Sequence, residues 1–167
     1  MTTKTLDIPA NDGTFGIQVP DSGTLRPGDY AVSVRLRPEA GSDVVMSDTV
    51  RAVVSERGSP LGEAVMWRRG PSTGIQFLRT ADPRFQRSER LKLELASDPG
   101  TAVVGRVLDR AGKPLQVPVR VTERTDAASG LRWIVAETTL APLAPGDYAI
   151  EVAAGDTKQV TGFRVIP

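Results

Sequence analysis

The sequence predicts an all-β protein. Short segments that are rich in β-branched residues or that alternate in polarity recur along the chain, and clusters of Gly, Pro and Asp separate them. With 16 Gly and 13 Pro among 167 residues, few windows are long enough for an amphipathic helix. The expected strands are residues 15–19, 30–36, 44–54, 91–95, 103–108, 117–121, 133–137, 148–152 and 160–165.

An internal repeat organises these strands. Residues 25–34, LRPGDYAVSV, recur as LAPGDYAIEV at 143–152, and the same offset aligns Phe15 with Trp133 without a gap. A shared aromatic residue, turn and alternating strand predict two copies of one supersecondary unit. The alignment also predicts that the rings of Phe15 and Trp133 lie in the core.

Each copy of the repeat predicts a specific bend in the chain. A loop leucine, Leu25 or Leu143, is expected to pack back into the core, after which Pro-Gly reverses the chain direction. The tyrosine that follows, Tyr30 or Tyr148, is expected to open the next strand with its ring buried and its hydroxyl bonded to the loop backbone. Each bend therefore predicts a pair of antiparallel strands.

The Leu-x-Pro-Gly-x-Tyr sequence in both copies resembles fibronectin type III and related immunoglobulin-like repeats, which have a tyrosine corner between strands E and F. The resemblance implies E strands at Phe15 and Trp133, and F strands that begin at Tyr30 and Tyr148. The segment GRVLDRAGKPL at 105–115 also looks like prealbumin-like and carboxypeptidase regulatory-like sandwiches. We therefore expect two immunoglobulin-like, antiparallel β-sandwich units.

Three regions follow from this organisation. Residues 1–56 are expected to form the C-terminal half of the first sandwich, because the repeat begins too near the N-terminus to leave room for the earlier strands. Residues 88–167 hold enough strands for a complete second sandwich. Residues 57–87 are expected to form a basic connector; the alternative is that 63–67 and 74–77 pair as a hairpin that completes the first sheet.

The connector carries a further resemblance. Residues 68–74 (RRGPSTG), 84–90 (RFQRSER) and 140–148 resemble the C-terminal region of bacterial proteins that carry a von Willebrand factor A-related domain upstream. The resemblance implies a module of a larger secreted or surface protein, an extracytoplasmic location and polypeptide preceding Met1. The Asp-x-Ser-x-Ser metal-binding motif of the A-related domain does not occur in this sequence, so no metal site is carried over.

The composition argues against several classes of function. A net charge of +1 gives no overall field to attract nucleic acid, and no segment approaches the ~20 apolar residues of a membrane span. The absence of Cys excludes disulfides, and the absence of His removes the commonest general base and transition-metal ligand. We therefore expect no nucleic-acid partner, no membrane insertion and no cofactor.

One motif raises the question of catalysis. Residues 21–24, Asp-Ser-Gly-Thr, match the tetrad of aspartic proteases, in which two carboxylates share a proton. The equivalent residues of the second copy, 139–142, contain no Asp, so a homodimer would have to supply the second carboxylate; Asp-Ser-Gly is also a favoured turn sequence. Residues 11–13, Asn-Asp-Gly, are too short for a calcium loop. The sequence therefore predicts no catalytic and no metal site.

The strongest local charge lies between residues 57 and 90, where seven arginines accompany three carboxylates. One hypothesis is a docking surface for an acidic protein or an anionic glycan, with arginines as bidentate donors and a tryptophan as a stacking face. The alternative is a solvated connector whose arginines cover apolar surface and pair locally. The candidate partner-binding residues are Trp67, Arg68, Arg69, Arg84 and Arg87.

Three functions remain open at this stage. The first is a non-catalytic structural and protein-interaction module, in which exposed strand edges would also allow a homodimer. The second is a carbohydrate-binding accessory module, for which Trp67 is the expected platform because Trp133 is assigned to the core. The third is an aspartic-type hydrolase acting through Asp21.

Overall fold

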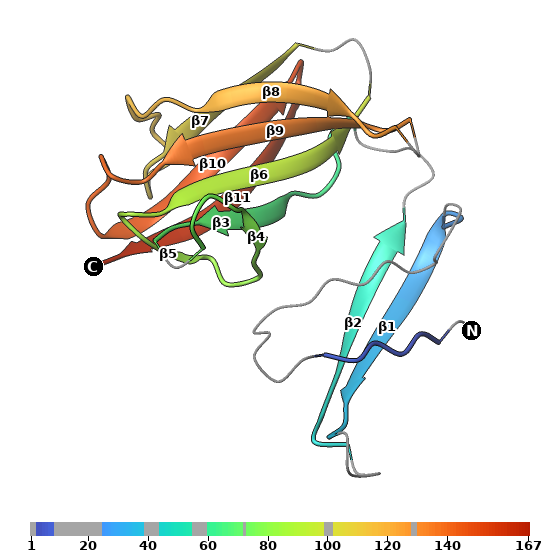
Figure 1. Ribbon diagram of the computed structural model, residues 1–167. Coiled ribbons are helices and arrows are strands. Elements are labelled where there is room, and N and C mark those ends of the chain that lie inside the picture. The colour runs from blue at the N-terminus through green and yellow to red at the C-terminus, as the bar shows by residue number, and fades with distance from the viewer. Residues whose placement is uncertain are drawn as a thin grey trace. The chain divides into compact units, whose positions relative to one another are not determined.

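The computed structural model describes residues 3–8, 25–38, 44–54, 60–71, 73–98, 102–127 and 130–167. Within this part of the chain there is no helix, and the strands pair in antiparallel fashion except for one short parallel pair. The predicted all-β class is therefore confirmed. Residue contacts divide the chain into two compact units: the strands at 28–54 belong to the first, and the strands from residue 65 onward belong to the second (Figure 1).

The described strands of the first unit, β1 (Gly28–Leu36) and β2 (Met46–Val54), form an antiparallel hairpin. Alternation along the strands gives the hairpin an apolar face and a polar face. Val32 and Val50 lie opposite each other on the apolar face and are 47% and 57% exposed. The described strands of this unit therefore leave their apolar face largely uncovered.

The second unit contains two sheets (Figure 1). The five-stranded sheet has the order β4-β3-β6-β9-β8, with β3 at Val65–Arg69, β4 at Leu78–Arg79, β6 at Arg90–Ser97, β8 at Arg120–Thr125 and β9 at Arg132–Thr139. The four-stranded sheet has the order β5-β11-β10-β7, with β5 at Arg84–Gln86, β7 at Val103–Leu108, β10 at Gly146–Ala154 and β11 at Thr157–Ile166. Among the described strands of this unit, only β5 and β11 run parallel.

One hydrophobic core lies between the two sheets of the second unit, as in a β-sandwich. Three alternate leucines of β6 are fully buried because the other residues of that strand face away from the core. From the opposite sheet, the ring of Phe163 contacts Phe85 edge-on at 6.3 Å and stacks on Tyr148 at 5.8 Å. The main core side chains are Phe85, Leu91, Leu93, Leu95, Val107, Ile134, Leu140, Ile150, Val152, Phe163 and Val165.

The bend predicted from the repeat is present in both units. Tyr30 and Tyr148 each lie near the start of a strand, and each hydroxyl donates a hydrogen bond to the carbonyl oxygen four residues earlier. The distance is 2.6 Å from Tyr30 Oη to Arg26 O, and 3.0 Å from Tyr148 Oη to Ala144 O. The bond between the hydroxyl and the loop backbone is thus confirmed in both copies.

The loop leucines of the two copies differ. Leu143 is 3% exposed and belongs to the core, as predicted, whereas Leu25 is 42% exposed. The prediction for Leu25 is wrong for a physical reason: the described part of the first unit has no second sheet against which a loop leucine can pack. Burial of this residue type thus depends on an opposing layer in addition to the turn.

The predicted core position of Trp133 is also wrong. Along β9 the buried side chains are Ile134, Ala136 and Thr138, and Trp133 occupies the alternate face, where it is half-buried. A side-chain period of two excludes Trp133 from the core once Ile134 faces inward. Phe15, which the repeat aligns with Trp133, lies outside the described residues.

The basic region after residue 60 belongs to the second unit. A hairpin does form there, since β3 pairs with β4, but β3 also pairs with β6 over five residues, and no pairing joins it to β1 or β2 among the described strands. The hairpin therefore extends the second sandwich and does not complete the first sheet. Met66 of β3 faces inward and packs against the leucine-rich core. This packing explains why β3 pairs with β6 of the second unit.

Candidate functional site

The basic residues of β3 lie on opposite faces of the five-stranded sheet. Met66 and Arg68 face the core, whereas Trp67 and Arg69 face away from it, on a surface that we call the outer face. The register of the paired strands then places the other residues of this surface in four rows. The rows are Arg79-Trp67-Lys92-Glu137-Arg120, Arg69-Arg90-Thr139, Val65-Glu94-Val135-Thr122 and Ala96-Trp133-Arg124.

Cations surround the aromatic rings at the β3 side of the outer face. The Arg79 guanidinium carbon lies 5.1 Å from the centroid of the Trp67 ring, and Lys92 Nζ lies 4.4 Å from it. Lys92 Nζ also lies 4.8 Å from the ring of Phe77, and the Arg69 guanidinium lies 5.4 Å from the same ring. These distances are within the range of cation–π attraction, so the rings hold the cations in place.

A similar contact lies at the β8 side of the outer face. The Arg124 guanidinium lies 5.3 Å from the Trp133 ring centroid, and its Nη2 atom lies 3.3 Å from Glu94 Oε2. Lys92 Nζ contacts the other oxygen of Glu94 at 2.9 Å. Glu94 is thereby almost buried, and it links the cations of the two halves of the face.

The outer face carries an excess of positive charge. Its four rows contain six cations and two carboxylates. The cations are Arg69, Arg79, Arg90, Lys92, Arg120 and Arg124, and the carboxylates are Glu94 and Glu137. Glu137 pairs with Arg90 at 2.8 Å. Among the described residues, no carboxylate forms an ion pair with Arg69 or Arg120. This surplus contrasts with the chain as a whole, whose net charge is only +1.

Two of these arginines lie directly opposite each other. Arg69 and Arg90 are cross-strand partners at the end of the β3–β6 ladder, an arrangement of like charges that weakens a sheet. A shallow pocket of about 260 Å³ adjoins them. Its lining residues are Arg69, Gly70, Pro71, Gly74, Ser88 and Arg90. Two guanidinium groups and a serine at one pocket form a surface suited to a carboxylate.

Arg68 is half-buried at the edge of the core, in contrast to the exposed position that a docking role would require. Its guanidinium lies 4.8 Å from the ring of the buried Phe85, and its Nη2 atom donates to the carbonyl oxygens of Asp82 and Arg84 at 3.0 and 2.9 Å. Its Nη1 atom lies 3.6 Å from Glu89 Oε1. Arg68 therefore ties the β4–β5 loop to the edge of the core and is not part of the outer face.

Arg84 pairs with a nearby residue, whereas Arg87 bonds to a loop far along the chain. Arg84 donates two side-chain hydrogen bonds to Asp82, at 2.9 and 3.0 Å. These bonds, chiefly, lower the pKa of Asp82 to about 2. Arg87 donates to the carbonyl oxygen of Ala141 at 2.7 Å and so fastens the loop that follows β9. Of the five predicted partner-binding residues, only Trp67 and Arg69 thus lie on the outer face.

The outer-face cations that sequence reasoning missed are Arg79, Arg90, Lys92, Arg120 and Arg124. A signal for one of them was present, because Lys92 alternates with buried leucines in the segment at 90–95 and must face away from the core. Arg120 and Arg124 required the pairing of β8 with β9, which the local pattern does not specify.

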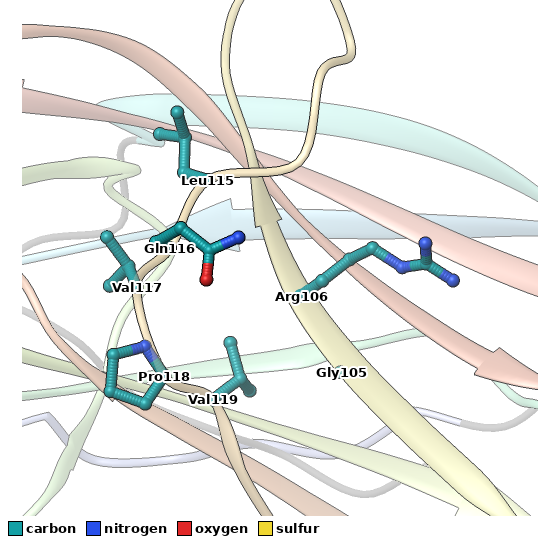
Figure 2. Close-up of a pocket in the computed structure, with 7 residues that line it drawn as sticks. All are labelled: Gly105, Arg106, Leu115, Gln116, Val117, Pro118 and Val119. Atoms are coloured by element: carbon teal, nitrogen blue, oxygen red, sulfur yellow. The ribbon is translucent and has the colours of Figure 1, made fainter.

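A second pocket lies at the free side of β7. It has a volume of about 280 Å³ and is lined by Gly105, Arg106 and the segment 115–119 (Figure 2). The chain approaches Gly105 closely, since an added Cβ atom would lie 2.7 Å from Val119 Cγ1. Glycine is therefore required for this packing, and the pocket contains no pair of groups suited to acid–base chemistry.

The sequence also raised a protease-like motif, a calcium-loop motif and the question of a membrane span. Asp21 and the Asn-Asp-Gly segment at 11–13 fall outside the described residues. In the ranges that the structure does describe, no group of three or more acidic side chains is placed to hold a metal ion. No helix there is long and apolar enough to cross a membrane.

Comparisons with known proteins add no family assignment. No protein-family model matches the chain, and no curated protein matches it.

Proposed function

We propose that the chain is a non-catalytic structural and protein-interaction module of a larger bacterial secreted or surface protein, with an immunoglobulin-like second unit. The tyrosine corner is the observation that supports this most strongly. Tyr148 follows the β9–β10 loop and bonds back to Ala144, as the conserved corner tyrosine does between strands E and F of immunoglobulin-like domains. The strand order gives independent support.

The orders β3-β6-β9-β8 and β11-β10-β7 correspond to A-B-E-D and G-F-C of a constant-type immunoglobulin sandwich. In this assignment β9 is strand E and β10 is strand F, which agrees with the resemblance of the repeat to fibronectin type III sequences. Such sandwiches act through sheet faces, strand edges and loops, and the outer face supplies the tryptophans and arginines that are common in protein–protein contacts.

A carbohydrate-binding module is the second candidate, because Trp67 and Trp133 lie on the same face. Against it, Arg79 and Lys92 lie near the Trp67 ring, and the indole N–H is buried without a hydrogen-bond partner within the described structure. A sugar platform needs an open ring face and accessible polar groups. A protein partner therefore fits this surface better.

Site-specific photo-crosslinking tests the proposal. A benzophenone amino acid at Thr122, on the outer face, should form an adduct with a defined protein from envelope fractions of the producing cells. The same group at the exposed Val104, which lies on the other sheet, is the matched control and should not form that adduct. Absence of a protein adduct at Thr122, together with binding to neutral glycans on an array, would replace the proposal with the carbohydrate-binding function.

A further inference from the structure

We infer that the outer face binds an acidic polypeptide segment, an inference that rests on the proposed protein-interaction function and names the chemistry of its partner. The surface is the set of four rows across β4, β3, β6, β9 and β8. It combines surplus positive charge with aromatic rings that hold the cations in position. The occupant follows from how these charges are distributed over the face.

Charge complementarity supplies the first argument. Arg69 and Arg90 lie opposite each other, and only Arg90 has a carboxylate partner among the described residues, at 2.8 Å. Arg120, at the other side of the sheet, lies opposite Glu137, which is already paired with Arg90. A partner carboxylate beside Arg69 would relieve the repulsion between the two guanidinium groups, and bidentate geometry would favour it further.

The position of the two carboxylates distinguishes the kind of anion. Glu94 and Glu137 lie on the central strands β6 and β9, between Arg69 and Arg79 on one side and Arg120 and Arg124 on the other. Arg90 and Lys92 on β6 pair with these carboxylates, so the middle of the face is close to neutral and offers little attraction to a uniform polyanion such as nucleic acid or a sulfated glycan. A polypeptide can place separated carboxylates over the two cationic sides and leave uncharged side chains between them.

The aromatic residues of the outer face also favour binding of an acidic polypeptide. Trp67 and Phe77 lie beneath cations that they hold in place, so less side-chain entropy is lost when a carboxylate binds. Tryptophan and arginine are also the residue types that dominate binding energy at protein interfaces. Salt should weaken the complex, because most of the attraction is between exposed charges.

The test uses the full chain and a fluorescein-labelled 12-residue peptide that has three Glu residues at each end and Thr residues between them, with fluorescence anisotropy as the measurement. Arg69→Gln and Arg120→Gln are the test variants, because neither arginine has an ion-pair partner among the described residues, so the substitutions break no internal ion pair. Lys113→Gln, in an exposed turn, removes the same charge away from the outer face. Unchanged tryptophan fluorescence and melting temperature will show that each variant is folded.

We expect the wild type to bind the Glu-Thr peptide and to ignore a Lys-Thr peptide. Arg69→Gln and Arg120→Gln should each raise the Kd by about 3- to 10-fold, and Lys113→Gln should leave it within about twofold. An equal effect of Lys113→Gln, tighter binding of heparin or duplex DNA than of the peptide, or no binding by the wild type would overturn the inference. A Thr122 crosslink to a protein that is insensitive to Arg69→Gln would refute the acidic partner while the interaction function stands.

Discussion

The hairpins β1–β2 and β10–β11 begin with the same Pro-Gly-Asp-Tyr sequence and have different surroundings. In both, the tyrosine hydroxyl bonds to the carbonyl four residues earlier. Yet Ile150 is fully buried, whereas its repeat equivalent, Val32, is 47% exposed. The comparison teaches that the turn and its hydrogen bond are encoded locally, whereas burial of the strand depends on an opposing sheet.

The partner strands differ as well. Tyr148 lies opposite Phe163 in β11 and stacks on its ring at 5.8 Å, whereas Tyr30 lies opposite Ala52 in β2. Likewise, Asp147 lies opposite Arg164, and its equivalent, Asp29, lies opposite Val53. The second hairpin therefore has cross-strand contacts that the first one lacks, although the sequences of β1 and β10 are similar.

The largest expected difference between the two hairpins comes from truncation of the equivalent apolar residues. Ile150→Ala should lower the free energy of unfolding of the second unit by about 2–5 kcal/mol, because it leaves a cavity in the core. Val32→Ala should cost less than about 1 kcal/mol, since half of that side chain is already exposed. Urea unfolding monitored by tryptophan fluorescence measures the first effect, because both tryptophans lie in the second unit; amide exchange in β1 measures the second. Equal losses would contradict the comparison.

Removal of the tyrosine hydroxyls should have a smaller effect, similar in the two units. Tyr148→Phe should destabilise the second unit by about 1 kcal/mol, because the bond to the Ala144 carbonyl is lost. Tyr30→Phe should produce a comparable loss in the first hairpin, measured by faster amide exchange in β1. Unchanged thermal melting of Tyr148→Phe would show that the corner is not a stabilising feature.

The smallest expected difference between the two hairpins is in how their stability depends on pH. Arg164 donates two hydrogen bonds to Asp147, at 2.6 and 2.9 Å, and these lower the pKa of that carboxyl. A lowered pKa in the folded state gives stability that is present above the unfolded pKa, near 4, and is lost as the pH falls through the folded value. The melting temperatures of wild type and Asp147→Asn should therefore differ at pH 7, and the difference should shrink as the pH falls below about 4. Asp29, the repeat equivalent of Asp147, lies opposite Val53, so the first hairpin has no arginine across from this carboxyl.

Local sequence features predicted the strands and bends well. The predicted strand at 103–108 matches β7 residue for residue, and the predicted strand at 91–95 lies within β6. These features depend on the period of two and on Gly and Pro at turns, both of which are properties of a few neighbouring residues. The same holds for the hydroxyl bonds of Tyr30 and Tyr148.

Features that depend on distant pairing were not predicted. The strand expected at 117–121 is instead β8 at Arg120–Thr125, because the preceding segment, with Pro118, does not pair in the ladder. The outward position of Trp133 depends on which face of β9 meets the core. The interior role of Arg68 depends on its contact with Phe85, which lies 17 residues further along the chain. Each of these facts requires knowledge of the neighbouring strand.

Amide hydrogen exchange of the full chain, measured residue by residue by NMR, tests the central claim most directly. On this account, the two copies share a bend but only the second hairpin packs against an opposing sheet. The amides of Ile150 and Val152 should then be protected to nearly the global free energy of unfolding of the second unit, and those of Val32 and Val34 should exchange far sooner. Equal protection of the four amides would contradict the claim that an opposing sheet, and not the hairpin itself, provides the stability.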